Sequence, residues 1–251
     1  MAEFAAGEEQ WIRRLGNLRN TVRQEMVRRQ LAGHVRPWMS VLDVGCGQGT
    51  QAIAMAALGC TVTGVEPSRQ LRELCARAAS ERAVSIELLD GTIEELRAVT
   101  RYRRFDVVCA HGLLMYMDDF FLSIRNLADR VTPAGLLSVT FRSGHALAMR
   151  PGLRRDWTGA LEAFGTERYI NELGVEARAH TLDEVVGALQ SCGLEVVDWY
   201  GVRVFNDAVA SDAEVPEHED LAALLDAEDR AGRLDPYRIL GSQLHVIARR
   251  I

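Results

Sequence analysis

The chain has 251 residues, of which 48% are hydrophobic and 25% charged, a size and balance that suit one α/β domain with insertions. Its formal net charge of −6 argues against sequence-independent binding of nucleic acid over a broad surface, because such binding needs many cationic contacts to phosphates. No apolar run approaches the roughly 20 residues of a membrane span, and the acidic start of the chain does not resemble a signal peptide, so we expect a cytoplasmic protein without a membrane partner.

Apolar residues recur at helical spacing within residues 8–34, which predicts a helix or a helix pair broken near Gly16-Asn17. Because this segment precedes the central strand described next, we expect residues 1–38 to form a helical lid. An arginine in that lid, Arg23, is placed to pair with the carboxylate of a ligand. The alternative is that Arg23 and its neighbouring arginines form a solvated basic face.

Residues 41–49, Val-Leu-Asp-Val-Gly-Cys-Gly-Gln-Gly, combine a short apolar strand with a glycine-rich turn. We expect a helix over about residues 50–58, whose free N–H groups point back at the turn. Glycine allows a positive φ and a close approach of the ligand to the backbone, so the turn with Gly45, Gly47 and Gly49 becomes a candidate nucleotide-binding site. The same glycines also satisfy the dinucleotide pattern G-x-G-x-x-G/A, and an ordinary strand-turn-helix packing unit is a further alternative.

Three acids lie at or near the ends of the first three predicted strands, and they help to distinguish between these kinds of ligand. Asp43 comes just before the first glycine, where it would repel a pyrophosphate but suit a ligand that carries a positive charge. Glu66 ends the run 61–65, where an acid can accept both ribose hydroxyls, and Asp90 closes the run 84–89. Three acids at three strand ends suit a cationic adenosyl ligand better than a phosphorylated one.

Strands and helices alternate from residue 41 to residue 141, which predicts a parallel sheet with helices on both faces. The expected strands are 41–45, 61–65, 84–89, 105–110 and 135–141, followed later by 195–205 and 243–248; the expected helices are 50–58, 68–80, 92–98 and 119–131. His111 follows the fourth strand, at the edge where ligands of such sheets bind, although a core or capping role is the alternative.

The alternation stops after residue 141. Residues 142–175 show no clear strand but are rich in arginine and aromatic residues, a Thr-x-x-Glu start at Thr181 predicts a helix, and an acidic helix is expected over 217–231. We interpret the chain as a single domain, 1–251, with a cofactor-binding half (39–141) and a substrate-side half (142–251) that carries cap insertions at 142–178 and 206–240. The five cysteines are scattered, so we expect neither a metal site nor a disulfide framework.

The glycine stretch, together with Glu66 and Asp90, resembles the class I S-adenosylmethionine-dependent methyltransferases. That resemblance implies a doubly wound, mostly parallel seven-stranded Rossmann-like sheet, S-adenosylmethionine as cofactor and S-adenosylhomocysteine as product. The chain is further similar to the branch that methylates 5-carboxymethoxyuridine in bacterial tRNA. Pieces that carry this similarity are Val22-Arg23-Gln24, residues 110–114 and 141–147, and most specifically residues 201–207 and 236–241.

By this resemblance, the cofactor would be contacted by residues of the lid, the glycine turn and the strand ends. These are Arg23, Asp43, Gly45, Cys46, Gly47, Glu66, Pro67, Asp90, Gly91, Thr92, Ile93 and His111. Two departures are visible: Glu66 stands where the family usually has aspartate, and residues 154–178 lack a basic run that would be expected to meet RNA.

A carboxylate acceptor is already ionised at neutral pH and needs no general base, which fits the absence of a catalytic triad pattern in the sequence. We therefore expect Arg203, with Arg142 and His145, to hold an anionic acceptor through charge-assisted contacts. The alternative for Arg203 is an exposed strand face or a pair with Asp207. Alternatives for the whole chain are a small-molecule O- or N-methyltransferase acting on an anionic metabolite, a nicotinamide-dependent oxidoreductase, and a binding module that turns nothing over.

Overall fold

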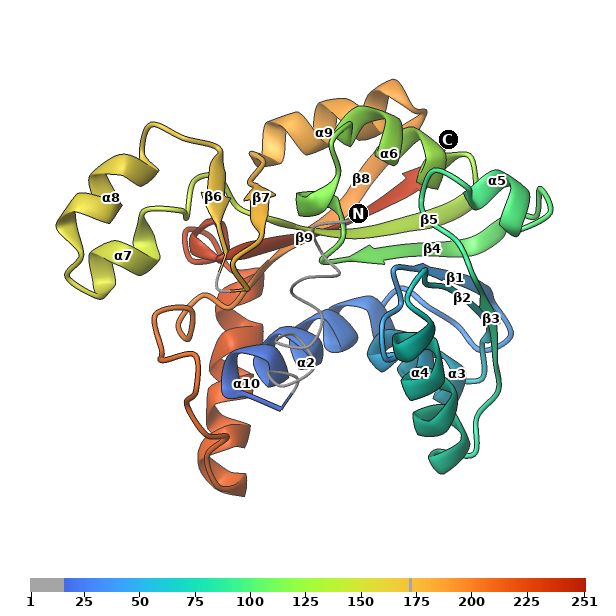
Figure 1. Cartoon of the computed structure of the whole chain (residues 1–251), viewed down its shortest axis with the longest axis horizontal. Helices are drawn as coiled ribbons and strands as arrows, with labels where there is room; N and C mark the ends of the chain where they lie inside the picture. The colour runs from blue at the N-terminus through green and yellow to red at the C-terminus, as the bar shows by residue number, and fades with distance from the viewer. Residues whose placement is uncertain (1–15, 172) are drawn as a thin grey trace. The chain divides into compact units, whose positions relative to one another are not determined.

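The computed structural model of the protein describes residues 16–171 and 173–251 (Figure 1). Within these residues the main sheet has seven strands in the order β3-β2-β1-β4-β5-β9-β8. They are β1 (Ser40–Val44), β2 (Thr61–Val65), β3 (Ile86–Leu89), β4 (Phe105–His111), β5 (Val131–Arg142), β8 (Leu194–Val202) and β9 (Gln243–Arg250). The strands from β1 to β5 pair in parallel, and the chain order reverses between β1 and β4. This confirms the predicted doubly wound sheet, whose ligand edge lies at that reversal.

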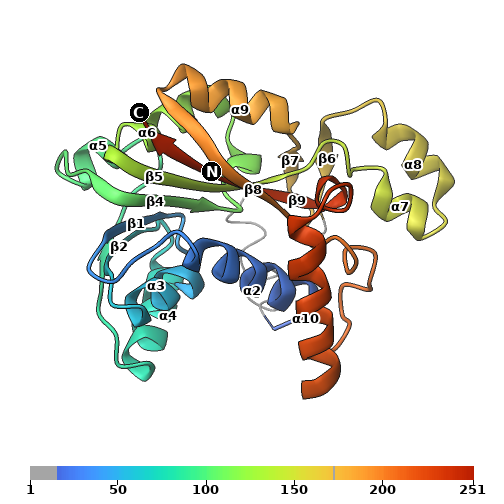
Figure 2. The same cartoon turned by 180° about the vertical axis from the view of Figure 1, so that it is seen from behind.

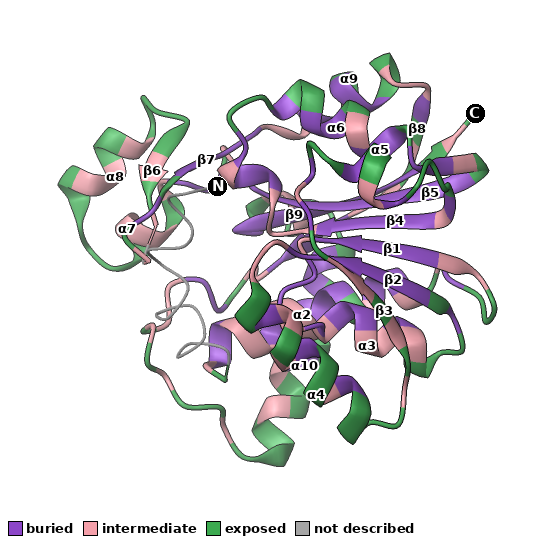
Figure 3. Cartoon of the chain, turned by 45° about the vertical axis from the view of Figure 1, so that its right-hand side comes forward, coloured by how far each residue is buried: buried purple, intermediate pink, exposed green. Residues whose placement is uncertain are grey.

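Helices cover both sides of the strands from β1 to β4. In all three overall views α3 and α4 lie on one side and α5 and α6 on the other (Figures 1, 2 and 3). The described helices are α2 (Leu18–Ala32), α3 (Thr50–Ala57), α4 (Arg69–Glu81), α5 (Leu96–Val99), η1 (Leu114–Tyr116), α6 (Phe120–Ala128), α7 (Met149–Leu153), α8 (Trp157–Ala163), α9 (Leu182–Ser191), α10 (His218–Arg233) and η2 (Arg238–Leu240).

The two central strands are buried on both faces, which explains why their sequences are continuous apolar runs. Val41 and Leu42 of β1 and Val107 and Val108 of β4 have no exposed surface (Figure 3). A strand that is covered by helices on both sides cannot alternate apolar with polar residues. The result is a rigid platform on which the loops after the strands are fixed.

The chain divides into two compact units. The first comprises residues 16–29 of the described chain, Phe141–Glu184 and Trp199–His245, and the second comprises Gln30–Thr140, Val185–Asp198 and Val246–Ile251. The glycine turn and the strand ends that follow it belong to the second unit, and the arginines after β5 and β8 belong to the first. The expected single domain with a lid and two caps stays a prediction.

The first unit contains its own apolar cluster and a small hairpin. Leu18, Val22 and Met26 of α2 pack with Val202 and with Leu225 of α10. Seen from behind, α7 and α8 lie together beside the hairpin of β6 (Arg168–Ile170) and β7 (Glu176–Arg178) (Figure 2). This antiparallel pair corrects the expectation that residues 142–175 hold no strand. Three-residue strands are too short to show a period of two, so the sequence pattern did not reveal them.

The two largest departures from the predicted strand bounds are in β5 and β8. Strand β5 starts at Val131 rather than at residue 135, so Pro133-Ala134-Gly135 lies inside the strand, where the pairing with β4 is irregular and Ala134 has a φ of 60°. Strand β8 ends at Val202, because Arg203 has a φ of 58°. The part of the predicted N-terminal helix before residue 16 lies outside the described residues. None of the described helices is long and apolar enough to cross a membrane.

Candidate functional site

The glycine turn after β1 takes the backbone conformation that its sequence predicts. Gly45, Gly47 and Gly49 have φ values of 68°, 55° and 86°. Gly49 is the residue that starts α3, and a Cβ atom placed on it would lie 2.3 Å from the Sγ of Cys75 on α4. Glycine is therefore required at this position both by the left-handed backbone and by the close packing of α4 beneath it.

Two of the predicted acids are buried close to this turn. Asp43 and Glu66 are 4% and 6% exposed. Burial raises the pKa of Asp43 to about 7, a hydrogen bond from the backbone of Ala52 opposes this rise, and the charge of Glu66 adds to it. Glu66 accepts hydrogen bonds from the backbone N–H groups of Gly47 (3.0 Å) and Ser68 (2.9 Å). Glu66 therefore ties the end of β2 to the glycine turn.

The third acid has a partner that the sequence did not indicate. Arg72 of α4 binds both carboxylate oxygens of Asp90, at 3.0 and 2.9 Å, and also donates to the carbonyl of Glu66. Asp90 is therefore neutralised by a bidentate ion pair at the end of β3. Of the three predicted acids, only Asp43 and Glu66 form a buried pair beside the turn.

The other residues predicted to contact the cofactor lie on the loops after β3 and β4 and around the turn. Gly91 packs so tightly that an added Cβ would lie 2.8 Å from Val99, the N–H of Thr92 donates to Glu95, and Ile93 is buried. His111 ends β4, and its Nε2 lies 2.8 Å from the Oγ of Ser138. The Sγ of Cys46 packs against Gly64 of β2, and Pro67, half-buried, follows Glu66 directly.

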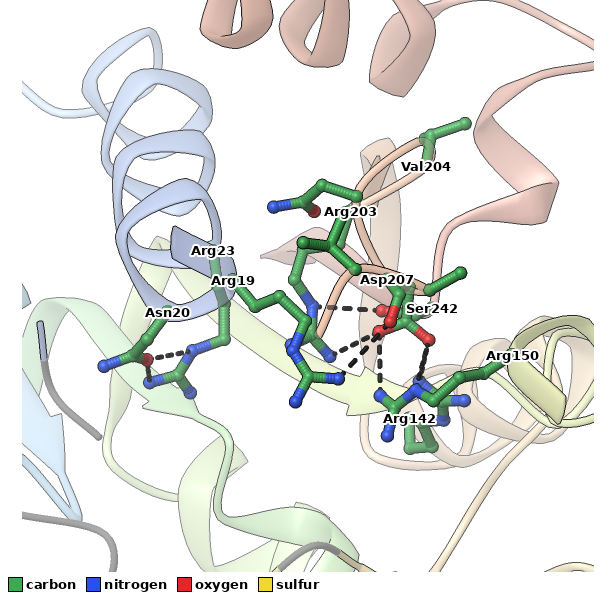
Figure 4. Close-up of polar contacts among 12 residues, drawn as sticks. Arg19, Asn20, Arg23, Arg142, Arg150, Arg203, Val204, Asp207 and Ser242 are labelled. Carbon is green, nitrogen blue, oxygen red and sulfur yellow. Dashed lines mark hydrogen bonds and ion pairs between the residues drawn. The ribbon is translucent and has the colours of Figure 1, made fainter. Parts of the chain in front are cut away.

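All of these residues belong to one edge of one unit, where parallel strands end. A left-handed glycine turn, a helix N-terminus and two buried carboxylates fit a cationic adenosyl ligand, because the carboxylates would repel phosphate groups. Arg23 belongs to the other unit, where its Nε and Nη2 donate to the Oδ1 of Asn20 on α2 (Figure 4). Its predicted contact with the cofactor stays a prediction, as do the individual cofactor contacts of the turn.

A second polar cluster lies in the first unit, where three arginines surround one carboxylate (Figure 4). Arg150 of α7 donates hydrogen bonds to both carboxylate oxygens of Asp207, at 2.9 and 2.8 Å. Arg142, at the end of β5, lies 3.3 Å from Oδ2, and Arg203, just after β8, lies 3.1 Å from Oδ1. Arg19 of α2 also donates to the backbone carbonyl of Asp207. We call Arg19, Arg142, Arg150, Arg203 and Asp207 the guanidinium cluster.

Burial and charge together set the protonation of this cluster. Burial alone would raise the pKa of Asp207, but the charges of Arg203, Arg150 and Arg142 outweigh it and hold that pKa well below the usual range. Burial lowers the pKa of Arg203 to about 10, so the guanidinium still carries its proton at neutral pH. The pair of Arg203 with Asp207, which the sequence left as an alternative, is thus present, and Arg203 lies beyond the end of β8 rather than on an exposed strand face.

The structure brings Arg142 and Arg203 together, but it does not bring His145 to them. His145 lies in an exposed turn after β5 and makes no hydrogen bond or ion pair with the described residues. Sequence reasoning missed Arg150 and the central role of Asp207. The i,i+4 spacing of Arg203 and Asp207 was the available signal for their pairing, whereas nothing in the sequence signalled Arg150. No group of three metal-ligating side chains occurs within residues 16–171 and 173–251.

Comparison with known proteins gives a consistent result. A family model described as a methyltransferase domain matches residues 41–135. The tRNA 5-carboxymethoxyuridine methyltransferase of Escherichia coli K12 is 26% identical over 94% of this chain and 89% of that protein. Residues 41–135 therefore carry a methyltransferase domain, and the chain as a whole is similar to a methyltransferase. Another relative, the ubiquinone biosynthesis O-methyltransferase of Methylobacterium nodulans, is 30% identical over 67% of this chain, and the match spans 64% of that relative, less than two thirds of its length.

Solved structures agree with this methyltransferase fold. Magnesium protoporphyrin IX methyltransferase from Synechocystis PCC 6803, determined with bound S-adenosylhomocysteine, covers 97% of this chain with a TM-score of 0.66 and 15% identity, and 94% of that chain is covered. S-adenosylhomocysteine is the product that S-adenosylmethionine leaves after it has donated its methyl group. The buried acids beside the glycine turn of the second unit are chemically suited to hold S-adenosylmethionine, and the nicotinamide alternative is set aside.

Proposed function

We propose that the methyltransferase esterifies a carboxylate, that of 5-carboxymethoxyuridine in tRNA. The observation that carries this proposal is the charge of the guanidinium cluster. Four arginines, Arg19, Arg142, Arg150 and Arg203, lie around Asp207, and the buried Glu228 is the other acid beside Arg203. Four positive and two negative charges leave an excess of positive charge, which the carboxylate of an acceptor would reduce.

The cluster has donors that Asp207 does not use. Each oxygen of Asp207 already receives two guanidinium contacts, while the Nε of Arg142 is buried and has no hydrogen-bond partner within the described residues. Both polar atoms of the Asn206 side chain, which is 2% exposed, are likewise unpaired there. Buried donors without partners cost free energy, about 1–3 kcal/mol each, and an acceptor carboxylate would supply a partner for the Nε of Arg142 or the Nδ2 of Asn206.

A carboxylate acceptor also agrees with the chemistry that this enzyme must perform. S-adenosylmethionine supplies an activated methyl group on a sulfonium centre, and a carboxylate is ionised at neutral pH, so no residue has to remove a proton. The protein is then required to bind and orient the acceptor, which is the function of fixed guanidinium groups. The nearly full-length similarity to a tRNA 5-carboxymethoxyuridine methyltransferase supports the same acceptor.

The direct test is transfer of a methyl group from S-adenosylmethionine to tRNA isolated from cells that lack this gene, with mass spectrometry of the released nucleosides. We expect 5-carboxymethoxyuridine to gain the mass of one methyl group and to become sensitive to mild alkali, as an ester is. tRNA that lacks the carboxymethoxy group is the control acceptor. Methylation of both tRNA samples, or of neither, would contradict the proposal.

Arg203→Ala tests the role of the cluster in the same assay. We expect kcat/KM for the acceptor to fall about 10- to 100-fold, which corresponds to a charged hydrogen bond of about 1.5–3 kcal/mol, while the affinity for S-adenosylhomocysteine stays unchanged. Arg203→Lys, which keeps the charge but loses the planar fork, should be intermediate. Arg69→Ala, which removes an exposed arginine paired only with Glu73 of its own helix, is the matched control. Unchanged turnover in Arg203→Ala would remove Arg203 from the acceptor site.

A small anionic metabolite is the second candidate acceptor. It is favoured by the net charge of −6, which opposes binding to a polyanion, and by the similarity to a ubiquinone biosynthesis O-methyltransferase. The tRNA assay distinguishes the two candidates, because a metabolite methyltransferase would leave the tRNA nucleosides unchanged.

A further inference from the structure

The loop that carries Arg203 and Asp207 is held by a glutamate from a helix later in the chain. Glu228 of α10 has no exposed surface. Its carboxylate accepts three consecutive backbone N–H groups, those of Val204 at 2.7 Å, Phe205 at 3.0 Å and Asn206 at 2.9 Å. A side-chain carboxylate with three backbone donors replaces the pairing that a strand or helix would otherwise give this segment.

This loop needs an external support because its backbone is strained. Arg203 has a φ of 58°, a left-handed conformation that is unfavourable for a residue with a side chain and that ends β8. Its guanidinium is nevertheless fixed at both ends, by Ser242 at 3.1 Å from Nε and by Asp207 at 3.1 Å from Nη2. A strained residue keeps its conformation only where its surroundings enforce it, and Glu228 binds the three amides that follow it.

We propose that Glu228 is a positioning residue for the acceptor: it fixes the backbone of residues 204–206 and thereby sets the positions of Arg203 and Asp207 in the guanidinium cluster. This inference rests on the proposed function, in which that cluster receives the carboxylate of the acceptor. Glu228 contacts main-chain donors of the loop, so its effect on the acceptor is transmitted through the loop.

The electrostatics of Glu228 agree with this role. Burial raises the pKa of Glu228, and the hydrogen bonds from the loop amides together with the charge of Arg203 oppose that rise. The carboxylate is therefore stabilised in its ionised form only while the loop amides and Arg203 are in place. The ordered loop stabilises the ionised form of Glu228, and the ionised carboxylate in turn holds the loop.

The variant Glu228→Gln keeps the size of the side chain but replaces one acceptor oxygen with an N–H₂ donor that faces backbone donors. Glu219→Gln, on the exposed first turn of the same helix, is the matched control. Hydrogen exchange measured by mass spectrometry reports on the loop directly. We expect the amides of residues 204–206 to exchange at least tenfold faster in Glu228→Gln and unchanged in Glu219→Gln. The thermal shift with S-adenosylhomocysteine should match wild type, which shows that the variant is folded.

Steady-state kinetics with tRNA that carries 5-carboxymethoxyuridine supplies the second readout. We expect the KM for tRNA to rise about tenfold in Glu228→Gln, with kcat and the KM for S-adenosylmethionine within about twofold of wild type. Unchanged exchange at residues 204–206, or faster exchange with an unchanged KM for tRNA, would overturn the positioning role. If wild-type enzyme does not methylate this tRNA, the proposed acceptor is wrong, and hydrogen exchange alone then decides whether Glu228 holds the loop.

Discussion

At the scale of single residues, burial changes the pKa of Asp43 and thereby links its ionisation to the binding of a cation. An acid in this position loses its hydration when β1 enters the sheet, and the nearby Glu66 makes a second negative charge still less favourable. The raised pKa, about 7, means that Asp43 is held between its neutral and charged forms near neutral pH. A bound cation would favour the charged form, so ligand binding and ionisation are linked.

We therefore expect the affinity for S-adenosylmethionine to increase with pH as Asp43 loses its proton. Below pH 7 Asp43 is mostly neutral and attracts a cation weakly, and above pH 7 it is charged, so affinity should rise by up to about tenfold per pH unit below 7 and then level off. Isothermal titration calorimetry between pH 5.5 and 8.5 would measure this. Asp43→Asn should bind more weakly and lose the rise, and a rise that persists in this variant would exclude Asp43 as its source.

At the scale of elements, the glycine turn and helix α9 place glycine under opposite constraints. Gly49 has a positive φ, and its missing Cβ leaves room for Cys75. Gly187 lies inside α9, is exposed, and has no atom near the position of an added Cβ. The same substitution therefore has opposite consequences at the two sites.

Gly49→Ala should destabilise the protein and weaken S-adenosylhomocysteine binding at least tenfold, because the methyl group would overlap the Sγ of Cys75. Gly187→Ala should stabilise the protein by about 0.5–1 kcal/mol, since alanine loses less backbone entropy than glycine in a helix, and should leave binding unchanged. Thermal denaturation with and without S-adenosylhomocysteine measures both effects. Equal stability of the two variants would contradict this account of the turn.

The elements also show which features the sequence could predict. The bounds of β1 and β4 differ from prediction by one residue at most, because strands buried on both faces are rich in apolar residues. The Thr181–Glu184 capping box that starts α9 was likewise readable, and both of its reciprocal hydrogen bonds are present. The contacts of Arg72, Arg150 and Glu228 could not be predicted, because each joins residues that are distant in sequence. The partners of Glu228 are in addition backbone groups, which every residue type except proline carries.

At the scale of the whole molecule, charge bears differently on the two candidate acceptors. The chain carries −6 overall, yet its guanidinium cluster holds an excess of positive charge. A net negative protein repels tRNA at long range, so an RNA substrate would have to be bound by a local set of phosphate contacts whose strength depends on salt.

If tRNA is the acceptor, its KM should rise steeply with salt. About three phosphate contacts, each contributing roughly 0.7 to the slope of log affinity against log salt, would raise KM about 20-fold between 50 and 200 mM salt. The KM for S-adenosylmethionine, measured in the same reactions, should change little and serves as the internal control. A KM for tRNA that does not depend on salt would mean that the enzyme does not bind the phosphate backbone.

The anchoring of residues 204–206 through main-chain groups has a consequence for how this enzyme can change. Because Glu228 accepts only backbone N–H groups there, it places no demand on the side chains of Val204 and Phe205, whereas the side chain of Asn206 is buried and is limited by its own packing. Proline is the exception, since it has no N–H to donate. Libraries that randomise residues 204 and 205 while Glu228 and Asn206 are retained should therefore keep the loop in place, and new acceptor preferences can be selected there without rebuilding the fold.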